Sequence, residues 1–214
     1  MKKVILFLIG IVVAGGLFYG LQGSSKDQRE ARITLHPIAT VTLGNGQQFK
    51  VELYPEEAPN TVNNFIALVK GNYYGDLTFN KILPDYLLQT GDKIGDGTGF
   101  PGYFIRSECS DNGYKNDVPL DEGVVCMSRG QKYNTEGSQF FILLSPRKDL
   151  EGTYAAFGKV IEGLDCLKEM SKMAPNELMQ REEGLQVSRI EVNTFGKYYG
   201  EPQVLSLAEV RELK

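Results

Sequence analysis

The sequence predicts a mainly β domain, a barrel or a sandwich, with two helices. Short apolar runs separated by Gly, Asn, Asp and Pro recur along most of the chain, which is typical of all-β folds. Two other stretches change to the helical period. The chain has 214 residues, of which 42% are hydrophobic and 23% are charged. One domain with extensions and a packed core is therefore expected.

Strands are predicted in a hairpin and in several further runs. In ATVTLGNGQQFKVELY, apolar and polar residues alternate on both sides of residues 44–46, a Gly-Asn-Gly turn. The further runs are, in chain order, LTFNKIL, YLLQTGD, GYFIRSE, GVVCMS, SQFFILL, AAFGKVI and SRIEVNTF. Turn-forming residues stand between them, as expected between the strands of a barrel or sandwich.

Two helices are predicted from apolar residues at helical spacing. The apolar face of the first is formed by Val62, Phe65, Ile66 and Val69. Pro59 and Asn60 favour a start there, and Gly71 favours an end just before it. A second helix is expected over residues 163–173, with an apolar face of Leu164, Leu167 and Met170.

Four parts are predicted along the chain. They are residues 1–22, a membrane anchor or signal peptide; 23–31, a polar linker; 32–196, the folded domain; and 197–214, a tail with one short helix. Lys2 and Lys3 precede an uncharged apolar run over residues 4–21. This run favours an uncleaved anchor, with a cleaved signal peptide or a buried helix as alternatives. Anchor and signal peptide both predict an extracytoplasmic domain, held at the membrane or secreted.

Composition argues against several classes of partner and chemistry. The net charge is -4 and there is no basic cluster, so nucleic acid is not expected as a partner. His36 is the only histidine, which disfavours a Ser/His/Asp site and a His-based metal site, and a surface position is expected for it. Cys109, Cys126 and Cys166 form no C-x-x-C pair, so neither disulfides nor zinc are indicated. No metal or cofactor is predicted.

The glycine-rich stretch GDKIGDGTGFPG, residues 91–102, has three interpretations. A calcium loop would use Asp92 and Asp96, but Tyr103 stands where an acidic ligand is needed. A dinucleotide loop would need a helix after it, and Pro101 interrupts. A tightly turned loop that depends on glycine is the preferred interpretation.

Two adjacent aromatic residues in SQFFILL are expected to face opposite sides of the sheet. Side chains alternate along a strand, so one of Phe140 and Phe141 enters the core and the other lies on the outer surface. An outer aromatic residue is either solvated or the floor of an apolar groove. The sequence leaves both alternatives open.

Four stretches, taken in order, resemble the cyclophilin family. They are FKVELYPEEAPNTVNNFIALVKGNYY, FNKILPDYLLQTGD, GVVCMSRGQKYNTEGSQFFILL and LEGTYAAFGKVIEGLDCLKEM, and they span about residues 38–175. The resemblance implies a closed eight-stranded antiparallel β-barrel capped by two α-helices, with a groove for proline peptides on its outer face. It also implies rotation of X-Pro bonds as the activity, in a bacterial exported or membrane-anchored member. The barrier to peptide rotation is about 18–20 kcal/mol, and a donor directed at the proline nitrogen lowers it in the twisted state.

The resemblance also implies roles for individual residues. Lys81 and Gln89 take the catalytic positions, and Gln139 is the second glutamine that binds the peptide backbone. An apolar floor for the proline ring is implied for Tyr86, Leu87, Phe141 and Leu150. The other substrate-binding positions are Phe79, Ser128, Arg129 and Tyr154.

Several of these positions depart from the family pattern. Phe79-Asn80-Lys81 stands where the family has F-H-R, so an ammonium replaces the planar guanidinium. Arg129 replaces an asparagine and Tyr154 a histidine. Asp149 replaces the tryptophan that contacts cyclosporin, which argues against binding of that drug.

Two functions are compatible with these departures. The first is a peptidyl-prolyl isomerase of reduced activity, in which Lys81, assisted by Arg129, acts on proline-containing segments of unfolded or folding exported proteins. The alternative is a non-catalytic proline-peptide-binding module or chaperone that uses the same groove. A structural barrel domain is a third hypothesis, disfavoured because Gln89, Gln139, Phe141 and Leu150 keep the groove chemistry.

Overall fold

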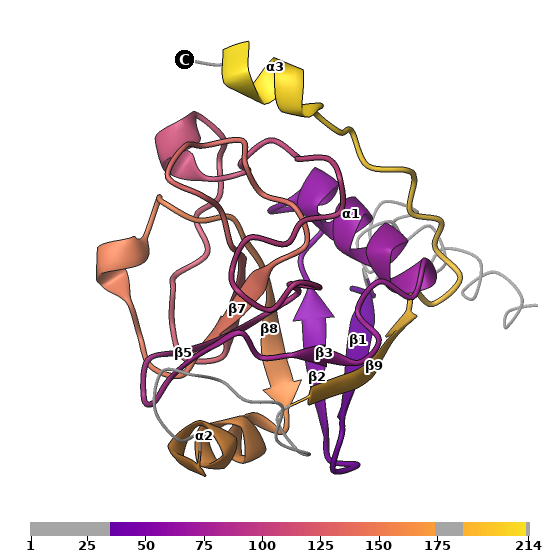
Figure 1. Cartoon of the computed structure of the whole chain (residues 1–214), viewed down its shortest axis with the longest axis vertical. Helices are drawn as coiled ribbons and strands as arrows, with labels where there is room; N and C mark the ends of the chain where they lie inside the picture. Colours follow the sequence, from indigo (N-terminus) through magenta and orange to yellow (C-terminus); the bar gives the residue numbers. More distant parts are fainter. Residues whose placement is uncertain (1–34, 174–185, 213–214) are drawn as a thin grey trace, which may run out of the picture. The chain divides into compact units, whose positions relative to one another are not determined.

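One antiparallel sheet organises the computed structural model, which describes residues 35–173 and 186–212 (Figure 1). Its strands in this part of the chain are β1 (Ile38–Leu43), β2 (Gln48–Leu53), β3 (Leu77–Thr78), β4 (Lys81–Leu83), β5 (Leu87–Thr90), β6 (Val124–Met127), β7 (Phe140–Leu143), β8 (Ala156–Glu162) and β9 (Gln186–Asn193). The predicted anchor and the whole of the predicted linker lie outside the described residues. Within those residues, none of the helices has the length and apolar character needed to cross a bilayer.

The sheet is curled, but its backbone pairing does not close. The strand order is β3-β9-β1-β2-β8-β6-β7-β5-β4, nine strands within the described residues, where a closed barrel of eight was predicted. The two end strands, β3 and β4, follow each other in sequence and are separated only by Phe79 and Asn80. Phe79 turns into the core there, and a side-chain bond from Thr90 Oγ1 to the carbonyl oxygen of Thr78, 2.8 Å, links β5 to β3.

The predicted hairpin and the first helix are confirmed. β1 pairs with β2 across the turn at residues 44–47. The helix α1 (Pro59–Lys70) begins with Pro at a position where no N–H donor is needed, and it ends before Gly71. Its first free N–H groups, those of Asn60 and Thr61, donate to the Glu108 carboxylate at 3.0 and 2.8 Å. A distant acidic residue therefore caps this helix.

The second helix, α2 (Leu164–Met173), begins one residue later than predicted. Gly163 precedes it with φ +83°, and a Cβ there would lie 2.6 Å from the carbonyl oxygen of Gln48. Gly163 is thus a turn residue, which only glycine fits. Figure 1 shows α1 and α2 toward opposite ends of the curled sheet, and both helices contribute side chains to the same apolar cluster.

One predicted strand is wrong. GYFIRSE forms only two isolated bridges, Phe104 with Leu205 and Ile105 with Glu136. The first partner belongs to the C-terminal tail, which packs on the domain and ends in the short helix α3 (Leu207–Glu212). Tyr199 and Val210 of the tail are buried at 7% and 6% exposure.

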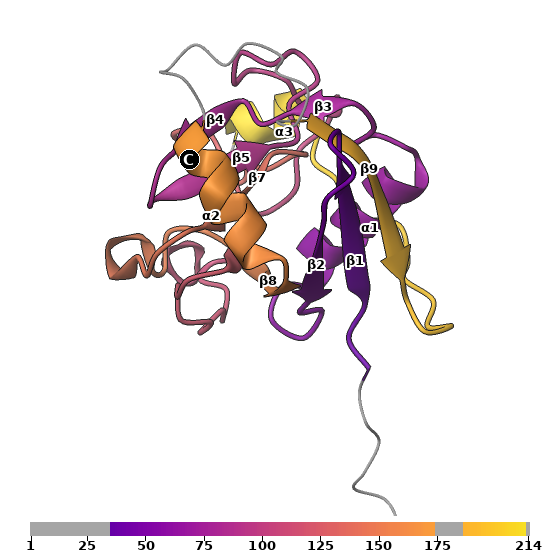
Figure 2. The ribbon, with the colours of Figure 1, turned by 90° about the horizontal axis from the view of Figure 1, so that it is seen from below.

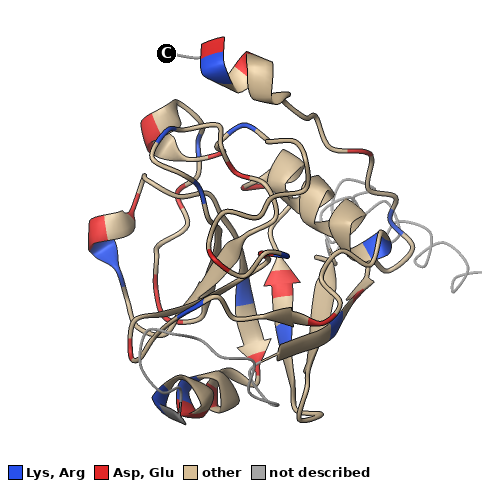
Figure 3. Ribbon diagram, in the orientation of Figure 1, with Lys and Arg blue, Asp and Glu red and all other residues tan. Residues whose placement is uncertain are grey.

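Apolar side chains form two clusters, one on each face of the sheet. Phe140 lies in the larger cluster, among residues of β1, β2, β8 and α1. Phe141 lies in the smaller one, with Leu87, Cys126 and Leu143. The two rings face opposite sides, as predicted, but Phe141 is only 3% exposed and does not lie on open surface. Figure 2 shows β2, β1 and β9 side by side in that order, as the strand pairing requires. Charged residues of both signs are interspersed over the described part of the fold (Figure 3).

Candidate active site

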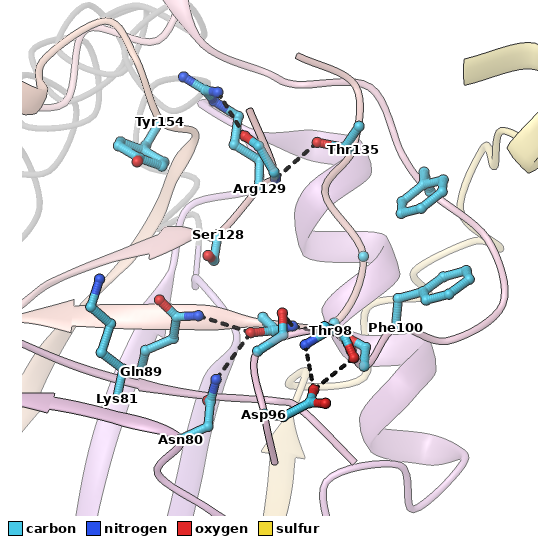
Figure 4. Close-up of a pocket in the computed structure, with 17 residues that line it drawn as sticks. Asn80, Lys81, Gln89, Asp96, Thr98, Phe100, Ser128, Arg129, Thr135 and Tyr154 are labelled. Atoms are coloured by element: carbon cyan, nitrogen blue, oxygen red, sulfur yellow. Dashed lines mark hydrogen bonds between the residues drawn. The ribbon is translucent and has the colours of Figure 1, made fainter. Parts of the chain in front are cut away.

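A pocket of about 640 Å³ lies beside β4, β5 and β7 (Figure 4). Its lining includes these residues that were predicted for the site: Lys81, Gln89, Ser128, Arg129, Gln139 and Tyr154. Residues 96–100 form another side of the pocket, so backbone and polar side chains dominate its surface. The polar half of the predicted site is therefore brought together.

A ladder of amides orients the two glutamines. Gln89 Nε2 donates to Gln139 Oε1 at 2.8 Å, and Asn80 Nδ2 donates to the same oxygen at 3.2 Å. Gln139 Nε2 in turn donates to the carbonyl oxygens of Gly97 and Gly99 at 3.0 and 2.8 Å. Because both carbonyls require the amide nitrogen, the oxygen of Gln139 must face Gln89. Gln89 is held with its own oxygen outside this ladder.

Lys81 lies directly opposite Gln89 in the pairing of β4 with β5. Opposite residues in an antiparallel pair point to the same face, and Figure 4 shows the two side chains extending in the same direction. Lys81 is exposed, and among residues 35–173 and 186–212 it forms no ion pair. Its ammonium can therefore donate to a ligand in the pocket.

Arg129 lines the same pocket but is engaged by the protein. Its Nε and Nη1 atoms donate, at 3.0 to 3.3 Å, to the carbonyl oxygens of Thr153, Gly130 and Gln131. The guanidinium lies 4.3 Å from the ring centre of Tyr133 and 5.0 Å from that of Tyr154. Through these hydrogen bonds and cation–π contacts, Arg129 holds the surrounding loops together. Lys81 is the cation with fewer contacts to the protein.

The predicted apolar floor forms a cluster beside the pocket but does not line it. Tyr86, Leu87, Phe141 and Leu150 all belong to the smaller apolar cluster. Leu87 is only 5% exposed, and the ring of Tyr154 covers Phe141 edge-on with centroids 5.1 Å apart. Tyr154 therefore packs against this cluster and covers Phe141.

Arg147 and Asp149 form an ion pair at the edge of the smaller apolar cluster. Arg147 donates from Nε and Nη2 to both carboxylate oxygens of Asp149, at 2.8 and 2.6 Å, and these hydrogen bonds lower the pKa of Asp149. The Arg147 guanidinium also lies 3.7 Å from the ring centre of Tyr86. This edge of the floor is charged instead of aromatic.

The structure corrects the predicted role of Phe79. Its side chain is 0% exposed and belongs to the larger cluster, so the predicted contact with substrate is wrong. Side chains alternate at the end of β3, which turns Phe79 inward beside Asn80 and Lys81. Phe79 supports these two residues from the core.

The other residues that line the pocket were not predicted for the site, and they include Asp96, Thr98, Phe100 and Phe104. The stretch 91–102 is the expected tight loop, because a Cβ at Gly99 would collide with Asp92 Oδ1. No cluster of potential metal ligands occurs among the described residues. Phe100, an aromatic residue inside a glycine-rich run, was the signal available in the sequence.

Two titratable groups lie in unexpected surroundings. His36 is not a free surface residue, since its ring nitrogens contact Glu52 and Glu56 at 3.2 and 3.0 Å. Glu136 is fully buried beneath the pocket and accepts a hydrogen bond of 2.6 Å from Ser107 Oγ. Burial raises the pKa of Glu136 to about 7.

The family model for cyclophilin type peptidyl-prolyl cis-trans isomerase/CLD matches residues 38–192. The chain belongs to the cyclophilin family. The expected enzyme class, peptidyl-prolyl cis-trans isomerase, is confirmed at the level of this family, in which the curated relatives carry that name. Peptidyl-prolyl cis-trans isomerase B of Bacillus subtilis is 41% identical over 60% of this chain and 87% of that protein. Peptidyl-prolyl cis-trans isomerase-like 3 of Gallus gallus is 39% identical over 62% of this chain and 81% of that protein.

Solved structures show the same fold. A cyclophilin type peptidyl-prolyl cis-trans isomerase from Cryptosporidium parvum, crystallised in the presence of the dipeptide Ala-Pro, matches with a TM-score of 0.62 and 27% identity. The match covers 73% of this chain and 99% of that one. The cyclophilin-like architecture is thus shown, within which the sheet of the present chain stays open.

Proposed function

We propose that the chain isomerises X-Pro bonds with Lys81 as the donor to the amide nitrogen. The observation that carries this proposal is the cross-strand pair of Lys81 and Gln89. The ammonium has no ion pair within the described part of the chain, and it stands beside an amide fixed by Gln139. The crystallisation of a related cyclophilin with Ala-Pro supports an X-Pro peptide as the ligand. The Gln89 oxygen accepts from the peptide backbone, and the ammonium donates to the lone pair that the nitrogen gains only when the bond is twisted.

Reduced activity follows from the donor type. Loss of one preorganised donor typically costs about 2.7–4 kcal/mol of transition-state stabilisation. An ammonium is a compact, strongly hydrated point charge and offers no planar fork. Arg129 donates to three carbonyl oxygens of the protein and is not free to supply the missing donor. Lys81 is therefore the group that restores part of that stabilisation.

Two-dimensional exchange NMR on an Ala-Pro peptide tests the proposal. The full chain, Lys81→Arg and Lys81→Ala are compared, with Lys132→Ala as the matched control at an exposed lysine outside the pocket. We expect exchange cross-peaks with wild type and the control, stronger ones with arginine, and none with alanine. Peptide shifts without exchange in every variant would instead establish the binding module.

We further propose that the substrates are exported proteins and that the domain acts outside the cytoplasm. The support is the apolar run over residues 4–21 after Lys2 and Lys3, which fits an anchor or a signal peptide. Carbonate extraction of membranes and N-terminal sequencing of the recovered chain test this. An intact N-terminus in the membrane pellet indicates an anchor, a shortened chain in the extracellular fraction indicates a signal peptide, and an intact chain in the cytosol overturns the proposal.

A further inference from the structure

Phe100 and Phe104 form an aromatic wall on the pocket. Their rings are stacked, with centroids 4.9 Å apart and 6° between the planes, and both residues line the pocket. Phe100 remains 43% exposed, and Figure 4 shows it across the pocket from Lys81. Exposed aromatic surface within a polar pocket is typical of a surface that binds an apolar group.

The backbone of this wall is held from two sides. On one side, the N–H of Phe104 donates to the carbonyl oxygen of Leu205 at 2.9 Å, and the N–H of Leu205 donates back at 2.7 Å. On the other side, the N–H of Ile105 donates to the carbonyl oxygen of Glu136 at 2.9 Å. The wall therefore lies between the C-terminal tail and the loop that leads to Gln139.

The tail is anchored independently of the wall. The Asn60 side chain at the start of α1 exchanges two hydrogen bonds with the backbone of Gln203, at 2.9 and 2.7 Å. Tyr199 and Val210, on either side, are buried. Residues 197–212 lie beyond the part matched by the family model, so this support belongs to the additional segment of the chain.

We propose that the tail is a specificity-determining part of the peptide site, holding the Phe100–Phe104 wall where it binds a large apolar side chain flanking the X-Pro unit. This inference rests on the proposed function of the pocket. Phe100 and Phe104 contact the peptide, whereas Leu205 is a positioning residue that acts through Phe104. The wall has aromatic faces, so it selects Phe, Tyr or Leu over Ala.

Peptide preference tests the inference. The probes are acetyl-Ala-Ala-Ala-Pro-Ala-Ala-amide and two versions with Phe placed two residues before or two residues after the proline. For wild type we expect one Phe peptide to have a KM about fivefold below that of the reference, the size of one aromatic contact. KM values within twofold of each other for all three peptides would overturn the inference.

The variants separate the wall from the tail. The ratio to be measured is the KM of the reference peptide divided by the KM of the preferred Phe peptide. Phe100→Ala should bring this ratio toward one because it removes an aromatic ring. Leu205→Pro should do the same because proline at 205 removes the N–H that donates to Phe104. Val204→Pro is the matched control, because the N–H of Val204 donates to no acceptor among the described residues, and it should keep the wild-type ratio. If Leu205→Pro fails to fold, Asn60→Ala, which frees Gln203, replaces it. A wild-type ratio in both Phe100→Ala and the tail variant would overturn the proposal.

Failure of the inference and failure of the proposed function give different results. Equal KM values with rapid exchange leave the isomerase intact and remove the aromatic subsite. Absence of exchange, with NMR shifts that still show tighter binding of one Phe peptide, removes the isomerase and keeps the subsite.

Discussion

The ring of Tyr154 stands perpendicular to the ring of Phe141, with the centroids 5.1 Å apart. Tyr154 also lies against the guanidinium of Arg129, 5.0 Å from the ring centre. Tyr154 thus covers Phe141 of the smaller apolar cluster and also contacts Arg129 at the pocket. Its contribution comes from the ring, since the hydroxyl makes no hydrogen bond among the described residues.

Removal of this ring should destabilise the domain. We expect Tyr154→Ala to lower the free energy of unfolding by about 2 kcal/mol, because two aromatic contacts and partly buried apolar area are lost. Tyr154→Phe keeps the ring and should stay within about 0.5 kcal/mol of wild type. Urea unfolding measures both, and an equal loss in the two variants would show that the hydroxyl matters instead.

The amide ladder should control catalysis through Gln139. Gln139→Leu leaves Gln89 without its acceptor and two glycine carbonyls without their donor. We expect kcat/KM on an Ala-Pro peptide to fall about tenfold or more, at the lower end of the cost of unpaired polar groups. Gln131→Leu, at an exposed position outside the pocket, is the control and should match wild type. Unchanged kcat/KM in Gln139→Leu would remove the ladder from the mechanism.

Glu136 should make stability depend on pH. Burial raises its pKa to about 7 in the folded chain, above the ordinary value of 4.5. Between these values the unfolded chain loses the proton first, so stability falls as pH rises from about 4.5 to 7, by about 3 kcal/mol in total.

The contribution of Glu136 is the difference between the pH dependence of stability in wild type and in Glu136→Gln. Glu136→Gln should lose the slope in that window and become more stable than wild type at pH 8, as measured by urea unfolding at several pH values. Glu151→Gln, at an exposed carboxylate, should keep the wild-type slope. Parallel pH curves for wild type and Glu136→Gln would show that the buried carboxyl titrates normally.

Two glycines with positive φ should differ in their tolerance of alanine. Gly91 has φ +94°, and a Cβ there would collide with the carbonyl oxygen of Ser138. Gly46 has φ +82° with no atom within 4 Å of a Cβ. We expect Gly46→Ala to cost about 1 kcal/mol and Gly91→Ala about 3 kcal/mol or more, in thermal or urea unfolding. Similar losses would mean that the backbone near Gly91 relaxes.

Elements with local signals could be predicted. The hairpin follows from its Gly-Asn-Gly turn, and α1 follows from its apolar spacing together with Pro59 and Gly71. GYFIRSE shows the limit of such signals, because its alternation is strand-like but its backbone bonds go to Leu205 and to Glu136. Strand formation requires a partner, and the partner is not encoded in the segment.

The features of the site also divide into those that could be predicted from the sequence and those that could not. The resemblance predicted one site for Lys81, Gln89 and Gln139, and the three residues line one pocket in the structure. It could not show that Tyr154 covers Phe141, that Arg129 is engaged by three carbonyls or that Phe79 is buried. Each of these depends on which side chains from distant segments come into contact.

The sequence by itself determined the family, the hairpin turn, and the positions of α1 and α2. Turns and helices depend on residue type and spacing over a few residues, and the family depends on the order of several such stretches along the chain. Only the tertiary structure decided the exposure of each site residue, the ladder that fixes Gln89 and the contact of the tail with Phe104. Burial and hydrogen-bond pairing are set by residues far apart in sequence, so the folded chain was needed to establish them.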